Sequence, residues 1–144
     1  MQGGDLALKL LIVLSRSYKS VMAQVEKDIK GYGLAVMEFS VLELLYHKGT
    51  IPMQMIGDKV LMTSGNITYT VDKLEKKGLV RRVACPEDRR VTYAELTPEG
   101  QARFEDIFPQ HQAAVQQITA GLSPVEQAKT IELLKKLGHA AKAN

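Results

Sequence analysis

Apolar residues recur at steps of three and four along the first half of the chain, which is the period of an α-helix. Beyond residue 78 the period changes, and two short stretches rich in β-branched and aromatic residues flank a polar turn, a pattern typical of a hairpin. Helical spacing then returns. The pattern predicts helices over about 11–29, 37–48, 52–61 and 63–77, strands over 79–85 and 91–96 around a turn at 86–90, and helices starting at 97 and 123.

Residues with known preferences for helix ends mark the second, third and fourth helices. Gly49 and Gly78 follow the second and the fourth, where glycine readily takes the left-handed conformation that closes a helix. Pro52 is expected in the first turn of the third helix, because a proline there has no N–H to lose. Thr63 or Ser64 is expected to cap the fourth helix with its hydroxyl oxygen.

The two C-terminal helices carry the clearest start sites. Thr97 is a cap residue followed by proline at the first helical position, and residues 123–126 form a capping box, Ser-Pro-Val-Glu, with a proline inside it. Pro109 cannot donate a backbone hydrogen bond, so we expect it to kink the first of these helices or to split it near Phe108.

The terminal helices keep apolar faces that the compact centre of the chain, about 35–97, cannot cover. Apolar surface of this extent is rarely left in water. A second copy of the chain would bury it, with the terminal helices interleaved in a two-fold dimer. The apolar positions of the last two helices are Val115, Ile118, Leu122, Val125, Ile131, Leu134 and Leu137.

Composition agrees with one domain that works in a reducing compartment. The 144 residues include 45% hydrophobic side chains, enough for one core, and a single cysteine, Cys85, which excludes an internal disulfide. The three histidines are too scattered for a metal site, and no cofactor motif occurs. The apolar run from Leu6 to Leu14 is shorter than the roughly 20 residues of a membrane span and no basic residue precedes it. We therefore expect a cytoplasmic protein with no membrane partner.

The fourth predicted helix has two chemically different faces. Ile67, Val71 and Leu74 share one face at helical spacing and are expected to be buried. The opposite side and its flanks combine small polar donors at the N-terminal end with cations further along, which suits a helix in the DNA major groove. By itself the pattern fits an ordinary solvated helix as well. The outward residues are Ser64, Gly65, Asn66, Thr68, Tyr69, Asp72, Lys73 and Lys76.

The distribution of charge favours nucleic acid over plain solvation. Residues 59–90 hold eight Lys and Arg against four acids, a net charge of +4, whereas the whole chain carries +3 and the remainder therefore −1. The excess lies in the fourth helix and the hairpin. A short helix pair followed by a basic-tipped hairpin is the pattern of a winged helix-turn-helix, whose tip can place an arginine in a narrow minor groove.

The chain resembles the MarR family of transcriptional regulators over nearly its full length, and three segments carry the resemblance. They are residues 72–80 (DKLEKKGLV), 88–90 (DRR) and 96–100 (LTPEG). The family's wing pattern, Asp-x-Arg, falls on Asp88 and Arg90, so the resemblance implies that Asp88 braces the tip and Arg90 enters the minor groove. Residues 39–49 and 63–69, and residues 85–86 together with 88–92, are most similar to the MhqR-type, quinone-responsive branch.

The resemblance implies a fold class and a function. The fold is mainly α, a single domain over 1–144 with a winged-helix lobe at about 35–97 and dimerisation helices at about 5–30 and 98–142. The function is a homodimeric repressor on a pseudo-palindromic double-stranded operator, released by a small aromatic or quinone-type effector. The DNA-binding residues would be Thr63, Ser64, Gly65, Asn66, Thr68, Tyr69, Lys73, Lys76, Asp88, Arg89 and Arg90.

Other residues carry weaker expectations. An effector pocket where the dimerisation helices meet the lobe would be lined by Tyr18, Met22, Phe39, Leu42, Tyr46, Phe108 and His111, which otherwise belong to the core. Cys85 is a possible redox sensor, since Arg82 nearby could lower its pKa, or a small apolar filler. No nucleophile, phosphate loop or paired acids indicate an enzyme. The alternative function is a winged-helix module that binds an acidic protein rather than specific DNA.

Overall fold

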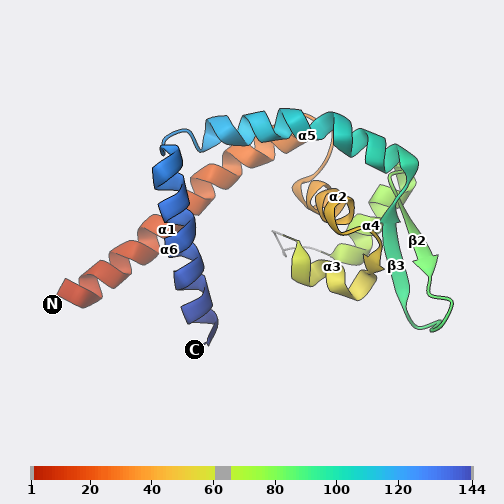
Figure 1. Cartoon of the computed structure of the whole chain (residues 1–144), viewed down its shortest axis with the longest axis horizontal. Helices are drawn as coiled ribbons and strands as arrows, with labels where there is room; N and C mark the ends of the chain where they lie inside the picture. Colours follow the sequence, from red (N-terminus) through yellow and green to blue (C-terminus); the bar gives the residue numbers. More distant parts are fainter. Residues whose placement is uncertain (1, 61–65, 144) are drawn as a thin grey trace.

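A computed structural model describes residues 2–60 and 66–143 of the chain, and this part of the protein is mainly helical, as predicted. The described residues form six helices and a small sheet, and the sheet lies beside α2, α3 and α4 (Figure 1). In chain order the elements are α1 (Gln2–Lys30), α2 (Val36–Lys48), β1 (Ile51–Pro52), α3 (Met53–Lys59), α4 (Ile67–Lys76), β2 (Val80–Ala84), β3 (Thr92–Leu96), α5 (Pro98–Ile118) and α6 (Pro124–Ala143).

The chain is arranged as a lobe at one end and the terminal helices at the other. Helices α2, α3 and α4 gather with the β2–β3 hairpin to form the lobe, and α5 runs from the hairpin across the top of the molecule (Figure 1). Helix α1 packs along α5, and α6 turns away from the far end of α5, well away from the lobe. None of the described helices combines the length and apolarity needed to cross a bilayer.

The sheet is antiparallel with strand order β1-β3-β2. The hairpin register pairs Val80 with Leu96 and Ala84 with Thr92, so the predicted hairpin is confirmed. The third strand, β1, adds Ile51 and Pro52 beside β3 and was not predicted. A strand of two residues is too short to show alternation, and proline is tolerated because β1 lies at the sheet edge. Pro52 consequently precedes α3 as its N-cap instead of lying in its first turn.

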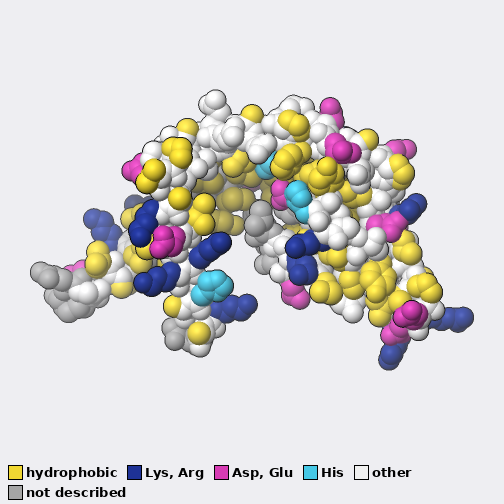
Figure 2. Space-filling model, in the orientation of Figure 1, with side chains coloured by type: hydrophobic (Ala, Val, Ile, Leu, Met, Phe, Trp, Pro, Cys, Tyr) yellow, Lys and Arg dark blue, Asp and Glu magenta, His cyan; other side chains and the backbone are white. Residues whose placement is uncertain are grey.

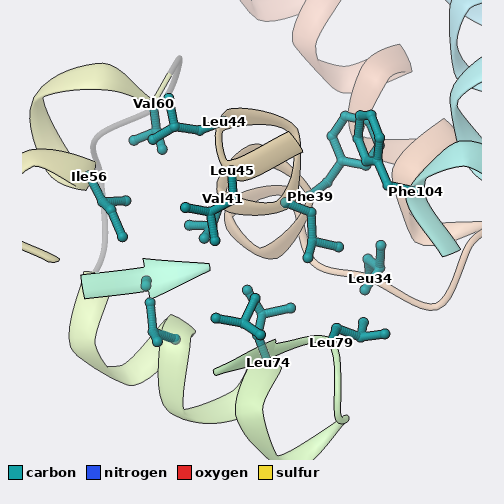
Figure 3. Close-up of a cluster of buried hydrophobic side chains, with 14 of the residues drawn as sticks. Leu34, Phe39, Val41, Leu44, Leu45, Ile56, Val60, Leu74, Leu79 and Phe104 are labelled. Atoms are coloured by element: carbon teal, nitrogen blue, oxygen red, sulfur yellow. The ribbon is translucent and has the colours of Figure 1, made fainter. Parts of the chain in front are cut away.

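The core of the lobe is built around α2, from which side chains radiate toward the surrounding elements (Figure 3). Val41 and Leu42 are fully buried there, and Leu45 almost so. Val71 and Leu74 meet this core from α4, which confirms two of the three residues predicted for the buried face of that helix. The third, Ile67, is partly buried against the same cluster.

The structure contradicts the predicted start of α4 and the split of α5 that was offered as one of two effects of Pro109. Helix α4 begins at Ile67 and its N-cap is Asn66, whose Oδ1 accepts a hydrogen bond from the Tyr69 backbone N–H at 3.1 Å. Thr63 and Ser64, the predicted caps, lie outside the described residues. Helix α5 continues through Pro109 without splitting. One missing N–H removes one hydrogen bond, which the packing of this 21-residue helix tolerates.

Helix α1 begins at Gln2, well before the predicted start near residue 11, but the other helix ends follow the sequence closely. Gly49 and Gly78 have positive φ angles of 78° and 77°, as expected for residues that close helices. Thr97 Oγ1 accepts from the Gly100 N–H at 3.0 Å and caps α5. At α6 the Ser123 N–H donates to Glu126 at 2.9 Å and Ser123 Oγ accepts from the Glu126 N–H at 3.2 Å, which confirms the capping box.

The terminal helices leave large apolar side chains in solvent. The exposed residues on α1 are Leu6, Leu8, Leu10, Leu11, Ile12, Val13, Leu14, Tyr18 and Val21, and those on α6 are Val125, Ile131, Leu133, Leu134 and Leu137. On α1 they surround the N-terminal half of the helix on every side. A helix that is apolar all round is normally enclosed by other elements. Within the described part of one chain, no element covers these apolar side chains of α1 and α6.

Candidate nucleic-acid interface

The outward face of α4 is polar and accessible. Asn66, Thr68 and Tyr69 are exposed at its N-terminal end, and the Tyr69 side chain is 60% exposed. Lys73 Nζ lies 5.4 Å from the centroid of the Tyr69 ring, a cation–π contact that holds both side chains on this face. Lys76 is exposed one turn further along. Thr63, Ser64 and Gly65 lie outside the described residues, so the face is defined here from Asn66 onward.

Asn66 has a structural task that the sequence prediction did not include. Its Oδ1 caps α4, which leaves only the side-chain NH₂ group to donate to a ligand. Helix capping by Asn typically contributes about 1 kcal/mol, because it satisfies an N–H that the first turn leaves unpaired. Substitution of Asn66 therefore affects both the start of α4 and any contact of the amide.

Arg82 joins the wing to α4. Its Nη1 pairs with Asp72 Oδ1 at 2.7 Å and with Glu75 Oε1, and its Nη2 donates to the Thr68 carbonyl at 3.4 Å. The Arg82 backbone N–H also donates to Glu75 Oε2 at 3.3 Å. Strand β2 is thereby fixed against α4 over two helical turns. This role was missed, because in the sequence Arg82 is simply one of eight cations in a basic segment.

Two other cations of that segment are also held by acids. Lys77 Nζ lies 2.9 Å from Glu38 Oε2 and 3.0 Å from Oε1. Arg81 pairs with Glu95 at 2.6 Å, and Thr50 Oγ1 donates to the second oxygen of Glu95 at 2.9 Å. Both acids lie outside residues 59–90, so the accessible excess of positive charge is smaller than the sequence count. Of the cations that the structure describes in residues 59–90, those that form no ion pair and remain available are Lys59, Lys73, Lys76 and Arg89.

These pairs also fix the charge state of the acids. Burial would raise the pKa of Glu38, but the Ala35 N–H and the bonded, charged Lys77 outweigh it and hold that pKa below its usual value. The hydrogen bonds from Arg81 and then Thr50 lower the pKa of Glu95. Both carboxylates are therefore ionised at neutral pH and keep their cations in place.

The hairpin tip presents one arginine on a carboxylate brace. Arg90 Nε lies 3.1 Å from Asp88 Oδ1 and Nη2 lies 3.3 Å from Oδ2, and the Arg90 backbone N–H donates to Oδ1 at 3.0 Å. These hydrogen bonds, the side-chain ones first, lower the pKa of Asp88. The Arg90 side chain is 90% exposed, and cations project beyond the protein surface at this tip (Figure 2).

A cleft of about 520 Å³ lies between α3, the start of α4 and the wing. Its floor and walls come from α3, α4, β2 and β3, so it joins the two predicted DNA-contacting elements into one surface. Gln54 and Thr92 contribute polar groups that the sequence did not single out. The lining residues are Met53, Gln54, Gly57, Ile67, Thr68, Arg82, Arg90 and Thr92.

A second, more apolar pocket of about 210 Å³ lies between α1, α2 and α5. Met22, Phe39 and His111 of the predicted effector-binding set line it. The other lining residues, Val25, Ile29, Val36, Ser40, Glu43 and Val115, were not predicted, although Val25 and Ile29 continue the helical stripe of Met22.

The remaining effector candidates lie elsewhere. Leu42 is fully buried in the core and is not among the residues that line this pocket. The Tyr46 ring packs on Phe104 with centroids 4.7 Å apart, and Phe108 packs on the same ring at 5.6 Å. Tyr18 is 56% exposed on α1. Aromatic type alone therefore did not separate pocket residues from core residues.

His111 is the polar group of this pocket with the best-defined partners. Its Nδ1 lies 2.8 Å from Asp28 Oδ2, and its ring packs against Phe39 with centroids 4.5 Å apart. Asp28 Oδ1 accepts a hydrogen bond from the Tyr32 hydroxyl at 2.6 Å. Burial, followed by this bond and the Asp28 charge, raises the pKa of Tyr32, so its hydroxyl stays protonated and acts as the donor.

Cys85 is partly exposed where β2 leaves the sheet, and its N–H donates to the Val91 carbonyl at 3.1 Å. The guanidinium of Arg82, which could have stabilised a thiolate there, is instead paired with Asp72 and Glu75. Among the described residues, no group of three or more His, Cys, Asp or Glu side chains is placed to hold a metal ion.

A helix with an exposed polar face, fixed beside a hairpin whose tip carries a braced arginine, defines a winged helix-turn-helix, a class of DNA-binding fold. Residues 34–92 match the model of the MarR family. The HTH-type transcriptional regulator MhqR of Bacillus subtilis (strain 168) is 52% identical over 136 residues, which cover 94% of each protein. The chain belongs to the MarR family and is a transcriptional regulator, not an enzyme.

Solved structures support the same fold. The chain resembles Sco3205 of Streptomyces coelicolor, a MarR family regulator determined in complex with DNA, with a TM-score of 0.76 at 26% identity over 89% of this chain and 85% of that one. It also resembles BpsR of Bordetella bronchiseptica, whose DNA binding is regulated by 6-hydroxynicotinic acid, with a TM-score of 0.78 at 25% identity over 88% and 90% of the two chains.

Proposed function

We propose that the protein is a cytoplasmic homodimeric repressor that binds a pseudo-palindromic operator and leaves it when a small aromatic or quinone-type effector binds. The observation that carries the proposal is the surface formed by α4, the wing and the 520 Å³ cleft between them. The lobe at about 35–97 would bind DNA, while the helices at about 5–30 and 98–142 would form the dimer.

Each part of this surface suits a different part of a duplex. Helix α4 would enter the major groove, with Asn66, Thr68 and Tyr69 near base edges and Lys73 and Lys76 near phosphates. The intervening sugar-phosphate strand would follow the cleft, where Gln54 and Thr92 supply donors. Thr63, Ser64 and Gly65 precede α4 in the sequence and would contact the same groove. The N-terminus of α4 would also attract a phosphate of the DNA backbone.

The wing would contact the next minor groove. Arg90 would enter that groove in the orientation set by Asp88, and Arg89 would contact the backbone beside it. Arg82 would act indirectly, since its bonds to Asp72 and Glu75 keep the wing at a fixed distance from α4. A fixed distance matters because major and minor grooves alternate at set intervals along a duplex.

The unpartnered apolar faces of α1 and α6 support a dimer of two identical chains. A two-fold dimer would present two copies of α4 to half-sites about one helical turn apart, roughly 34 to 36 Å. An effector in the α1–α2–α5 pocket would need only a few kcal/mol of preference for a dimer with wrongly spaced α4 helices to empty the operator.

The effector class rests on the pocket and on the relatives. The pocket is mostly apolar and includes the Phe39 ring, with His111 and Glu43 as polar groups, which suits a small aromatic molecule with one or two polar substituents. The similarity to MhqR supports a quinone-type compound. Cys85 would provide a second route if such a compound alkylated its thiol.

The test is a titration of the DNA upstream of the protein's own gene at several salt concentrations. Arg90→Ala should weaken binding across sequences and reduce the salt dependence by about one counterion. Asn66→Ala and Asn66→Ser should both relax preference at one base step by about 1 to 3 kcal/mol, because both remove the side-chain amide. The two variants differ in that only the serine keeps a cap for α4. If Asn66→Ser restores full preference, Asn66 acts only as a cap.

Two further outcomes decide the rest of the proposal. Weak binding without sequence preference would favour the protein-interaction module over the repressor. Adding benzoquinone should release the DNA, and the Cys85→Ser variant separates the routes: release that persists in this variant depends on the pocket, whereas release that disappears depends on the thiol.

A further inference from the structure

The connection between α1 and α2, residues 31–35, is held by side chains that come from opposite directions. On one side lies the α1–α2–α5 pocket, and on the other lies the C-terminal end of α4. Gly33 within the connection has a φ angle of +78°, which fixes a turn that residues other than glycine rarely adopt. A shift on either side is therefore transmitted through a short, constrained segment.

The pocket side is a chain of three hydrogen-bonding side chains. His111 lines the pocket and contacts Asp28 Oδ2 at 2.8 Å, while the other oxygen of Asp28 accepts from the Tyr32 hydroxyl at 2.6 Å. The side chains of His111 and Asp28 are only 12% and 15% exposed, so water competes little for these bonds. Tyr32 itself belongs to the connection, and its carbonyl accepts from Arg103 Nη2 at 2.5 Å.

The other side leads to α4. Lys77, the C-cap residue of that helix, donates from Nζ to the carbonyl of Gly33 at 3.3 Å, one residue after Tyr32. The same Nζ pairs with both oxygens of Glu38, a side chain that is 4% exposed at the start of α2. Lys77 therefore ties the last turn of α4 to the connection and to α2 at once.

We propose that Asp28 and Tyr32 are positioning residues that couple the pocket to α4. A molecule that changes the contact of His111 with Asp28 releases or tightens Tyr32, the connection moves, and Lys77 carries the movement to the last turn of α4. The inference rests on the proposed function, in that the pocket holds the effector and α4 reads DNA. It adds the residues through which one site acts on the other.

The coupling predicts an effect that needs neither effector nor DNA. The amide N–H groups of residues 77, 78 and 79 donate to the carbonyls of Lys73, Glu75 and Leu74 and close α4. In Asp28→Asn and Tyr32→Phe their hydrogen exchange should accelerate by about threefold or more, the size of effect found between residues of one bonded network. The Cys85 amide, bonded to Val91 in the wing, should exchange as in the wild type.

Matched controls separate this from general loosening of the fold. Glu26→Gln removes a carboxylate from the same helix, but Glu26 pairs only with Lys30, in an exposed i,i+4 contact of 3.0 Å. Tyr93→Phe removes a tyrosine hydroxyl from β3, away from the pocket. Neither substitution should change exchange at residues 77–79. If Asp28→Asn and Tyr32→Phe accelerate only residues 28–33, their role is local and the coupling is refuted.

A second readout uses the complete dimer and a duplex. In a double-mutant cycle on operator affinity, Tyr32→Phe and Lys77→Gln should be non-additive by about threefold, because both act on one connection. Tyr32→Phe and Arg89→Gln should be additive, since Arg89 lies on the wing tip. Additivity in both cycles would overturn the coupling. If the wild type binds no duplex specifically, the proposed function fails, whereas the exchange experiment still decides the coupling.

Discussion

Gly100 lies in the first turn of α5 at the point where this helix crosses the start of β2. A Cβ atom at this position would lie 2.0 Å from the Leu79 carbonyl oxygen and 2.9 Å from its carbon. Both are backbone atoms, so no side chain can turn aside to make room. The same carbonyl accepts the Thr97 N–H at 3.0 Å, which ties the end of the wing to α5. Gly100→Ala should therefore push the wing and α5 apart.

Two effects of opposite sign set the size of the change. Replacing glycine by alanine in a helix usually stabilises by roughly 0.5 to 1 kcal/mol. Overpacking in a close contact costs about 1 to 3 kcal/mol, and a clash between two backbones belongs at the upper end. The clash should win, with a net loss of about 2 kcal/mol. For a chain of this size, that loss lowers Tm by roughly 6 to 8 °C.

Thermal unfolding at a fixed protomer concentration measures the effect, because the stability of a dimer depends on concentration. Gly57→Ala in α3 is the matched control, since its Cβ would meet only the Ile67 side chain at an ordinary 3.8 Å. That variant should be neutral or slightly more stable. If Gly100→Ala unfolds at or above the wild-type temperature, α5 does not approach Leu79 as closely as the structure has it.

Two further predictions concern stability. Ser123→Ala removes the hydroxyl that accepts the Glu126 N–H and should cost about 1 kcal/mol in unfolding free energy, whereas an unchanged Tm would show that the start of α6 does not depend on this cap. Glu38→Gln should destabilise by about 1 to 2 kcal/mol at neutral pH, because half-exposed Lys77 loses its buried carboxylate. The folded-state pKa of Glu38 lies below its ordinary value of 4.5, so its contribution is present above that value and lost as the pH falls through the lowered pKa. The stability difference between wild type and Glu38→Gln should thus shrink in acid, and a constant difference would contradict the pairing.

Helix order, the hairpin and most helix ends could be predicted because they depend on local patterns. The caps at Thr97 and Ser123 and the glycines after α2 and α4 are local features of this kind. Strand β1 could not be predicted, since two residues carry no periodicity and its pairing with β3 depends on contacts distant in sequence. The cap of α4 was misplaced because three closely spaced residues with side chains that can cap a helix, Thr63, Ser64 and Asn66, compete for one role.

The candidate site was predictable in its faces but not in its pairings. Counting charges treated Lys77, Arg81 and Arg82 as available for DNA, yet each is held by an acid on a neighbouring element. Those acids include Glu38 and Glu95, which lie 39 and 14 residues away along the chain. Only the folded chain shows which cations are left over. The lining of the proposed effector pocket likewise depends on the folded chain, because Leu42, which was predicted to line it, belongs to the core, whereas Val115, which was not predicted, lines it.

In the proposed repressor, two copies of the chain hold their α4 helices at a fixed spacing over successive major grooves. Fluorescence anisotropy can compare a duplex that contains both half-sites with the same duplex carrying five extra base pairs between them. The insertion rotates one half-site by about half a helical turn. Affinity should then fall to that of a single half-site. Equal affinity for the two duplexes would show that the two α4 helices are not held at a fixed spacing.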